Sequence, residues 1–322
     1  MHTPTSFSEN RNIFSPLAFS LLPGVVGSRL DAAISRALPG LGVRARRRLW
    51  EWCEVFVNGR KKPAGFIVKG GEEIRIVPRK TQAETNVEKV QFFIVESSAD
   101  FVAFAKPAGL HSAHIAGGPE PSLESRLARE WPALWRQWSG NHSGSTGQPP
   151  ETPQLLTRLD KATSGLLLAA LSTDAAGRFR DMETEGQVGK DYFAVVHGSL
   201  ERSLTLVWRL LTDGRDKTTV LEETNPDRTR HTLVEPLRRV AIPDAGGSAC
   251  TLVRACIKRG ARHQIRAHLA HAGFPILGEQ LYAPGAKNGA GNLYLHHARL
   301  VFPGFNASFP PQWPGLDVAL LS

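Results

Sequence analysis

The sequence predicts an α+β protein of two parts, a small basic module followed by a larger domain. Three observations predict it: segments of helical and of strand-like periodicity occur in both parts, a polar stretch without an apolar period separates them, and charge is unevenly distributed. Residues 1–80 hold 14 Lys and Arg against 6 Asp and Glu, which is +8 of the total charge of +9. The basic module is therefore the candidate for binding a polyanion.

The composition is that of a folded protein from a reducing compartment. Of 322 residues, 41% are hydrophobic and 21% are charged, which supports a packed core. Cys53, Cys250 and Cys256 have no spacing typical of a disulfide framework or a zinc site. The apolar stretch at residues 13–26 is interrupted by Pro, Gly and Ser, so it predicts neither a membrane span nor a signal sequence. We expect a poorly ordered leader over residues 1–26 and a cytoplasmic protein.

Residues 27–78 are predicted to form the basic module. A short amphipathic helix follows Ser28, and a second helix begins near Val43. Two strands with Asn-Gly and Gly-Gly turns come next. The candidate RNA contacts are the basic residues Arg44, Arg46, Arg47, Arg48, Lys61 and Lys62. Such a run of charge on a single helix is equally typical of a solvated helix face.

The order of these elements distinguishes the two interpretations. A helix, a turn, an arginine-rich helix, V-x-V-N-G and G-G-E-E-I-x-I together resemble the S4 RNA-binding domain over residues 27–78. In that family the second helix and the following loop present basic groups to structured RNA, whose A-form duplex is bound mainly through its shape and phosphates. The polar residues 79–90 are expected to be a linker.

The larger domain is expected to span residues 91–322. Strands are predicted at residues 92–95, 101–104, 166–171 and 190–198. A helix is predicted to begin near Gly260. Residues 139–154 contain no hydrophobic side chain, so we expect a mobile surface insertion there.

Asp160 is the first candidate for chemistry, because it lies in a short turn between apolar segments. A carboxylate there is costly unless it is hydrogen-bonded or paired. The local pattern alone equally fits a structural turn, in which the side chain caps Ala162 or Thr163. Arg262 and Arg266 are four residues apart in the predicted helix, so they can direct two guanidiniums at one anion.

Four sequence blocks follow one another in the larger domain. They are R-L-D-x-x-T-S-G-L-L-L, K-x-Y-x-A-x-x-x-G, H-Q-I-R-x-H-L-A-x-x-G-x-P-I-x-G and L-Y-L-H-x-A-x-L-x-F. In this order they resemble the RluA-type family of RNA pseudouridine synthases, over about residues 92–305, and an S4 domain in front is common in that family. The resemblance implies an isomerase that acts on structured RNA, built on a mixed, largely antiparallel sheet. It implies no cofactor and no metal, because uridine itself supplies both ends of the new bond.

The resemblance also implies roles for single residues. Asp160 matches the catalytic carboxylate, which attacks C1′ or C6 or assists glycosidic cleavage; the sequence leaves these routes open. Tyr192 would stack on the target base and serve in proton removal. Arg266 would pair with Asp160 and keep it ionised. Arg158 would fill the stack that the flipped uridine leaves.

Two positions depart from the family pattern. Thr157 stands where the family usually has His, and Ala261 stands where it usually has Arg, with Arg262 one place later. These departures concern RNA positioning and target choice more than chemistry. Arg262 and His263 are further candidates for contact with RNA, and the histidines show no metal-binding spacing.

Several functional alternatives stay open at this point. The S4 resemblance favours large-subunit ribosomal RNA as the substrate, with transfer RNA as the alternative. A catalytically inactive RNA-binding or assembly protein could use the same fold, and an N-glycosidase that releases uracil could use a similar carboxylate together with water. We expect a monomer that has RNA as its partner and makes no contact with a membrane.

Overall fold

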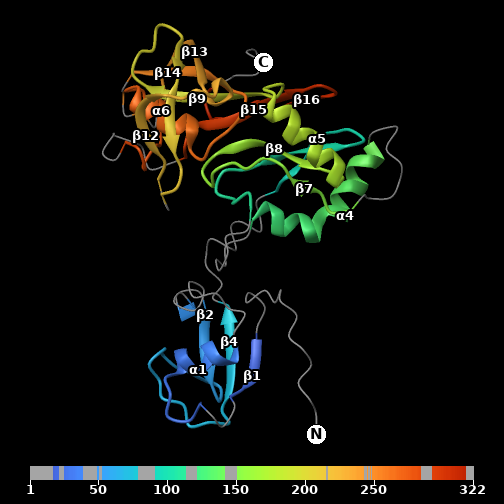
Figure 1. Cartoon of the computed structure of the whole chain (residues 1–322), viewed down its shortest axis with the longest axis vertical. Helices are drawn as coiled ribbons and strands as arrows, with labels where there is room; N and C mark the ends of the chain where they lie inside the picture. The colour runs from blue at the N-terminus through green and yellow to red at the C-terminus, as the bar shows by residue number, and fades with distance from the viewer. Residues whose placement is uncertain are drawn as a thin grey trace. The chain divides into compact units, whose positions relative to one another are not determined.

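The computed structural model describes residues 17–21, 25–38, 49–50, 53–78, 91–113, 122–141, 151–214, 217–242, 245, 247, 249–283 and 292–316. These residues form two compact units, one before residue 90 and the other from residue 91 on (Figure 1). The expected linker at 79–90 lies outside the described residues, as do Arg44, Arg46, Arg47 and Arg48.

The first unit is an antiparallel sheet with a helix. Its described strands are β1 (Leu17–Ser20), β2 (Cys53–Val57), β3 (Arg60–Lys61) and β4 (Glu73–Pro78), in the order β1-β4-β2-β3. Helix α1 (Leu30–Ala37) buries Leu30, Ala33 and Ile34, which share one face at helical spacing. They pack with Val55 and Ile74 of the sheet in one apolar core. This amphipathic pattern explains why the short helix forms next to the sheet.

Part of the expected leader belongs to this sheet. Residues Leu17 and Phe19 of β1 pair with Ile76 and Ile74 of β4, and Leu21 lies buried in the same core. The prediction of a poorly ordered leader is therefore wrong for residues 17–21. Alternating apolar residues gave this segment a side that the sheet could bury, and the neighbouring prolines and serines obscured that signal.

The second unit is built on a ten-stranded sheet (Figure 1). The described strands are β5 (Phe93–Ser97), β6 (Phe101–Lys106), β7 (Gln154–Leu155), β8 (Ser164–Ala170), β9 (Gly189–His197), β10 (Leu204–Leu206), β13 (Thr232–Val240), β14 (Cys250–Ile257), β15 (Leu295–Phe302) and β16 (Phe305–Ser308). Their order is β10-β13-β14-β9-β15-β8-β6-β5, with β16 beside β15 and β7 beside β8. Strands β15 and β8 run parallel, and the other described pairs are antiparallel. The predicted α+β class with a mixed, largely antiparallel sheet is confirmed.

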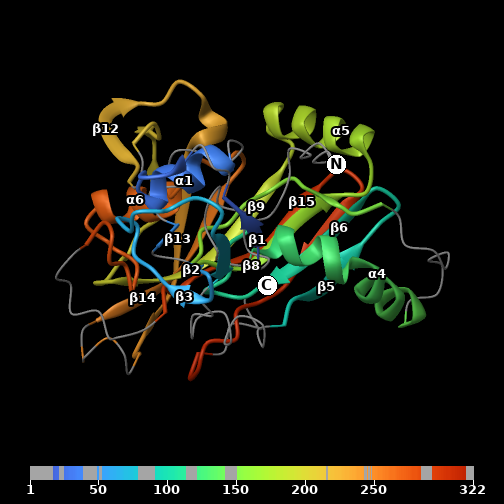
Figure 2. The same ribbon diagram turned by 90° about the horizontal axis from the view of Figure 1, so that it is seen from below.

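Two helices cover opposite faces of this sheet (Figure 2). The helices of the unit are α4 (Leu123–Asn141), α5 (Thr173–Thr184), the 3-10 turn η2 (Arg228–Arg230) and α6 (Gln264–His271). In β6, Phe101 packs near Phe179 of α5, whereas Phe104 meets the edge of Trp131 of α4 at a centroid distance of 6.0 Å. Side chains three apart on a strand point to opposite faces, so α5 and α4 enclose the strand between them. A separate hairpin is formed by β11 (Trp208–Leu211) and β12 (Thr219–Thr224).

The insertion expected at residues 139–154 is shorter than predicted, because regular elements include both of its ends. Helix α4 continues to Asn141, and β7 begins at Gln154. The helix extends this far because Trp131 and Trp135 anchor it and the indole N–H of Trp138 donates to the Ser97 hydroxyl at 2.8 Å. The prediction is wrong at both ends of the segment, and residues 142–150 lie outside the described part.

Candidate active site

Asp160 lies in the loop between β7 and β8, and hydrogen bonds hold this loop on both sides of the carboxylate. The Ser112 hydroxyl donates to the carbonyl of Leu159 at 2.7 Å and accepts from its N–H at 2.9 Å. The N–H of Gly109 donates to the carbonyl of Lys161 at 2.7 Å. These partners follow β6, so a segment about 50 residues away in the sequence positions the carboxylate.

A main-chain hydrogen bond closes the turn at Asp160, and the Asp160 side chain does not cap it. The N–H of Thr163 donates to the main-chain carbonyl of Asp160 at 3.1 Å, and the carboxylate is directed to Arg266 instead. After the turn, Gly165 has φ of +114° because β8 approaches β15 there, and a Cβ would lie 2.3 Å from the carbonyl oxygen of His297. Thr157, the departure before R-L-D, accepts from the N–H of Leu168 at 2.9 Å and so anchors the loop to β8.

Arg266 lies between two carboxylates. Its Nη1 donates to Asp160 Oδ2 at 3.0 Å, its Nε to Glu279 Oε2 at 2.7 Å and its Nη2 to Glu279 Oε1 at 2.9 Å. The side chains of Asp160, Arg266 and Glu279 are 22%, 11% and 0% exposed. Burial acts to lower the pKa of Arg266, but Glu279 and Asp160 outweigh it and raise the pKa above its ordinary value. The contact expected between Arg266 and Asp160 is therefore present, in a site that is largely removed from water.

Glu279 is a member of this network that the sequence motifs do not single out. Gly278 has φ of +85°, and a Cβ there would lie 2.3 Å from the carbonyl oxygen of Asn292, so only glycine fits the turn that brings Glu279 under Arg266. Burial acts to raise the pKa of Glu279, but Arg266 holds it below its ordinary value. A usable signal exists in the sequence: a buried guanidinium fork needs more acceptors than one carboxylate supplies, and Glu279 directly follows G-x-P-I-x-G.

Arg262 and Arg266 do not converge on one anion, so that prediction is wrong. His263 has a left-handed backbone with φ of 56°, and α6 begins only at Gln264. Arg262 therefore precedes the helix, and its Nη2 donates to the main-chain carbonyl of Lys217 at 3.1 Å. Four-residue spacing places side chains on one face only where the helix is continuous.

His263 lies beside the Asp160 oxygen that Arg266 does not bind. Its Nε2 is 3.6 Å from Asp160 Oδ1, and its Nδ1 is 2.9 Å from the hydroxyl oxygen of Tyr282. Burial lowers the pKa of His263, and the charge of Asp160 opposes that change only in part. The imidazole is therefore uncharged at neutral pH.

Tyr192, on β9, is packed face to face with His297 of β15. The ring centroids are 4.5 Å apart and the planes differ by 13°. Burial, and then the charge of Asp160, raise the pKa of the Tyr192 hydroxyl, which keeps its proton at neutral pH. His297 is uncharged because burial lowers its pKa to about 3, and its Nδ1 lies 2.6 Å from the carbonyl of Leu166. One face of Tyr192 is thus fixed by a neutral aromatic ring.

Lys106 is a second residue near Asp160 that the motifs do not single out. Its ammonium donates to the carbonyls of Pro107 at 2.9 Å and Leu110 at 2.8 Å. Burial lowers its pKa to about 7, while the charge of Asp160 acts in the opposite direction. The site therefore includes a lysine whose charge changes close to neutral pH.

The remaining candidates among the described residues lie outside this network. Arg158 is exposed, two residues before Asp160. In the first unit, Lys61 forms an ion pair with Glu54, and the Lys62 ammonium lies 4.7 Å from the centroid of the Phe66 ring. Their contact with RNA stays a prediction.

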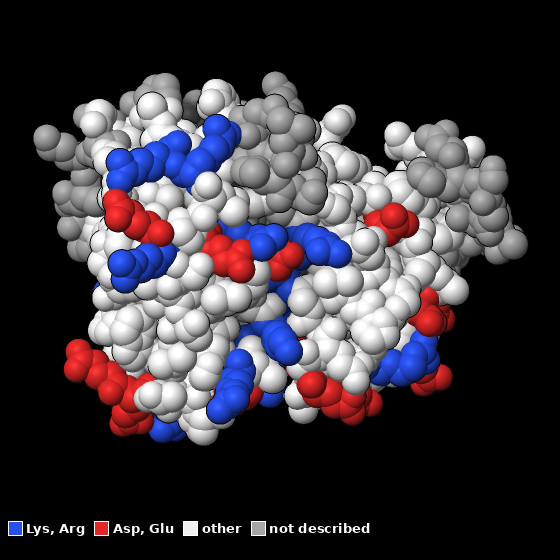
Figure 3. All heavy atoms as spheres, turned by 90° about the horizontal axis from the view of Figure 1, so that it is seen from above, with Lys and Arg blue, Asp and Glu red and all other residues white. Residues whose placement is uncertain are grey.

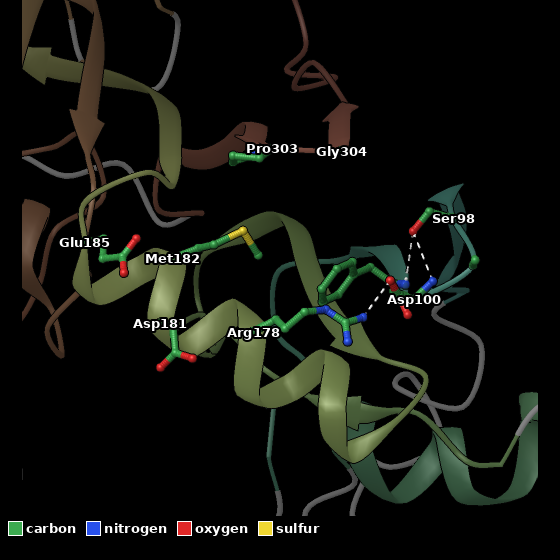
Figure 4. A pocket seen from close by; sticks show the side chains of 10 residues that line it. Ser98, Asp100, Arg178, Asp181, Met182, Glu185, Pro303 and Gly304 are labelled. Atoms are coloured by element: carbon green, nitrogen blue, oxygen red, sulfur yellow. Dashed lines mark hydrogen bonds and ion pairs between the residues drawn. The ribbon is translucent and has the colours of Figure 1, made fainter.

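A hollow of about 550 Å³ lies elsewhere in the second unit (Figure 4). The turn between β5 and β6, helix α5 and the turn between β15 and β16 enclose it, and its lining includes Asp100, Arg178, Asp181 and Glu185. Three carboxylates against one guanidinium do not suit a phosphate backbone. The hollow is therefore not a candidate for the RNA site predicted from the sequence.

Charge on the surface seen from above is mixed rather than continuously basic. Figure 3 shows Lys and Arg side chains across the middle of this face, with Asp and Glu side chains among them. This agrees with the near balance of charge after residue 80. None of the described helices is long and apolar enough to cross a membrane.

Comparisons with known proteins place these features in context. Residues 100–271 match the family model described as RNA pseudouridylate synthase. A protein named an uncharacterized RNA pseudouridine synthase, from Chloroflexus aurantiacus, is 28% identical over 265 residues, covering 81% of this chain and 77% of that protein. Ribosomal large subunit pseudouridine synthase D of Nitrosomonas europaea is 27% identical, covering 85% and 73%. The solved structure titled Human RNA Pseudouridylate Synthase Domain Containing 1 aligns with a TM-score of 0.54 at 21% identity, covering 74% of this chain and 89% of that one.

Proposed function

The chain belongs to the RNA pseudouridylate synthase family and is an isomerase acting on RNA, and from this premise we propose which residues carry the reaction and which RNA it modifies. The observation that carries the proposal is the Asp160 carboxylate held by Arg266 through one oxygen only. Its other oxygen, Oδ1, is directed to His263 at 3.6 Å, which is beyond hydrogen-bond distance. A carboxylate clamped on one side offers its second oxygen to a substrate.

Pseudouridine formation breaks the N1–C1′ bond of uridine and joins C5 to C1′. The base gains a proton at N1 and loses one at C5, so the overall change is an isomerisation. Asp160 is the nucleophile, or the group that assists cleavage of the glycosidic bond, and Arg266 pairs with it in a site where water is largely excluded. The geometry suits each of these routes.

Tyr192 supplies the surface on which the base lies. His297 fixes one face of its ring, and stacking on the rest of a buried aromatic ring orients a flipped base. The hydroxyl keeps its proton at neutral pH, so a part in removing the C5 proton requires that its own proton pass to another group.

The RNA substrate we propose is large-subunit ribosomal RNA, supported by the names of relatives such as the Nitrosomonas europaea protein. The first unit acts as an S4-like module for structured RNA, and its sheet-and-helix core and the basic residues at 60–62 support this. Arg158 enters the gap in the RNA stack that the flipped uridine leaves, since a planar guanidinium can both fill it and neutralise phosphates.

The test is carbodiimide mapping of pseudouridines in total RNA from cells with and without this protein. We expect the loss of at least one reverse-transcription stop in large-subunit ribosomal RNA, restored by the wild-type gene and not by Asp160→Asn. A stop lost in transfer RNA would assign the other RNA class. An unchanged pattern would support a protein without catalysis, and abasic sites at the same position would identify an N-glycosidase.

A further inference from the structure

Two hydrogen bonds and one longer contact connect the loop of the β11–β12 hairpin to Asp160. The main-chain N–H of Thr218 donates to the hydroxyl oxygen of Tyr282 at 2.9 Å. That oxygen lies 2.9 Å from His263 Nδ1, and His263 Nε2 lies 3.6 Å from Asp160 Oδ1. Tyr282 is thus the only residue in this series that contacts both the loop and the imidazole.

The position of each proton in this series follows from the chemistry of its groups. A main-chain N–H can only donate, so it occupies an acceptor site on the Tyr282 oxygen. The hydroxyl proton is then available for His263 Nδ1, which accepts it through the ring lone pair when the imidazole carries its own proton on Nε2. Burial raises the pKa of Tyr282 and lowers that of His263, so both groups are neutral and this assignment holds at neutral pH.

The carboxylate imposes the same proton arrangement from the other side. A neutral imidazole with its proton on Nδ1 would direct the Nε2 lone pair at Asp160 Oδ1, and two acceptors facing each other repel. With the proton on Nε2, an N–H dipole faces the carboxylate instead. The charged groups around the imidazole are Asp160, Arg266, Arg262 and Glu279, and of these Asp160 faces Nε2, at 3.6 Å.

Other contacts fix the Tyr282 ring in place. The Lys217 ammonium lies 5.2 Å and the Arg266 guanidinium 5.7 Å from the ring centroid. The N–H of Tyr282 donates to Glu279 at 3.2 Å, which ties it to the carboxylate that holds Arg266. The hairpin loop is itself held by Arg262, since the Thr218 hydroxyl donates to the Arg262 carbonyl at 2.8 Å.

We infer that Tyr282 is a positioning residue: it fixes the proton of His263 on Nε2 and so directs an N–H at the second oxygen of Asp160, in a state that depends on docking of the hairpin loop. This inference rests on the proposed function only for its effect on turnover. Arg266 holds Oδ2, and His263 limits the orientations of Oδ1, so the carboxylate presents one oxygen in one direction.

The test is long-range ¹H–¹⁵N NMR of the full-length protein labelled with ¹⁵N-histidine, which reports which ring nitrogen carries the proton. His263→Asn identifies the signals, because asparagine tolerates the left-handed backbone there. We expect the Nε2–H form in the wild type. Tyr282→Phe removes the donor to Nδ1, so the Nδ1–H form should become populated and the pKa of His263 should rise, since the lost bond stabilised the neutral ring.

A matched variant separates this role from general packing. Tyr294→Phe removes a hydroxyl from the same domain, away from His263, so it should leave the His263 signals unchanged. On substrate RNA, Tyr282→Phe should lower kcat about tenfold, the effect of one hydrogen bond, with little change in KM. An Nδ1–H form in the wild type, or an unchanged His263 in Tyr282→Phe, would overturn the inference. The expected NMR result with a protein that forms no pseudouridine would support it and count against the proposed function.

Discussion

Two of the Asp–Arg ion pairs in the described part of the second unit are alike in chemistry and different in surroundings. Asp160 and Arg266 are 3.0 Å apart, with side chains 22% and 11% exposed. Asp100 and Arg178 are 2.7 Å apart at the edge of the hollow of Figure 4, with side chains 47% and 54% exposed. The shorter pair is the one that faces water.

The N···O distance therefore does not indicate how much each pair contributes to stability. The groups that surround each pair do. Arg266 is held from the far side by the fully buried Glu279, whose carboxylate also accepts main-chain N–H bonds from Leu281 and Tyr282. A pair in water gains little, because solvent screens it and two long side chains lose freedom. A buried pair is costly to leave incomplete, so each member constrains the others.

The largest effect is expected for Asp160→Asn, which removes the charge and keeps the shape. Asparagine can still accept a hydrogen bond from Arg266, and Arg266 keeps its bonds to Glu279, so folding and RNA binding should change little. Turnover should fall below about 1% of the wild-type value while RNA affinity falls less than about tenfold. Single-turnover pseudouridine formation and a filter-binding titration measure the two quantities.

An equal loss of binding and turnover in Asp160→Asn would contradict this separation. It would show that the carboxylate organises the RNA site as a whole. Urea unfolding of the same variant is the control, because a large change in the midpoint would attribute the lost activity to the fold.

The sequence predicts the residues of this site that stand in local motifs better than those that reach it through long-range contacts. Asp160, Tyr192 and Arg266 stand in motifs, so they can be identified without coordinates, although their catalytic roles stay proposals. Lys106 could not be paired with them, since its contact depends on the packing of β6 beside the Asp160 loop, and Glu279 had only the indirect signal of an unfilled guanidinium fork, since its contact depends on a turn at Gly278. Such long-range contacts leave no periodic pattern.

The fold shows the same limit. Strands β6, β8 and β9 follow from apolar runs and alternation, which are local properties. The wrong prediction for Arg262 came from extending a helix through His263. Its left-handed backbone cannot be predicted from the sequence pattern. The parallel contact of β8 with β15, more than 120 residues later, is likewise a property of the assembled sheet.

Glu279→Gln should have an intermediate effect on activity and a large effect on stability. The amide offers one acceptor oxygen where the carboxylate offers two, so an NH₂ group must face an Arg266 donor, and the buried guanidinium loses half of its counter-charge. We expect the free energy of unfolding to fall by about 3 kcal/mol, measured by urea denaturation.

A carboxylate in a more exposed pair provides the comparison for Glu279. Glu235, 32% exposed, pairs with Arg254, 40% exposed, in the same sheet. Glu235→Gln should lower the unfolding free energy by less than about 1 kcal/mol. Similar losses of unfolding free energy in the two variants would show that burial of the Arg266 network adds nothing to the stability of the protein.

The smallest effect is expected for Arg178→Ala, which breaks the exposed pair with Asp100. About half of each side chain is in water, so the change in unfolding free energy should be within about 0.5 kcal/mol in either direction. Arg178 lies on α5, whose packing against the sheet depends on Ala175, Ala176 and Phe179, and the substitution leaves these contacts intact. Turnover should stay within about twofold of the wild type in the assay used for Asp160→Asn. A loss of stability comparable to that of Glu279→Gln would mean that a short ion pair stabilises this protein whether or not it is buried, and the ranking by burial would then have to be abandoned.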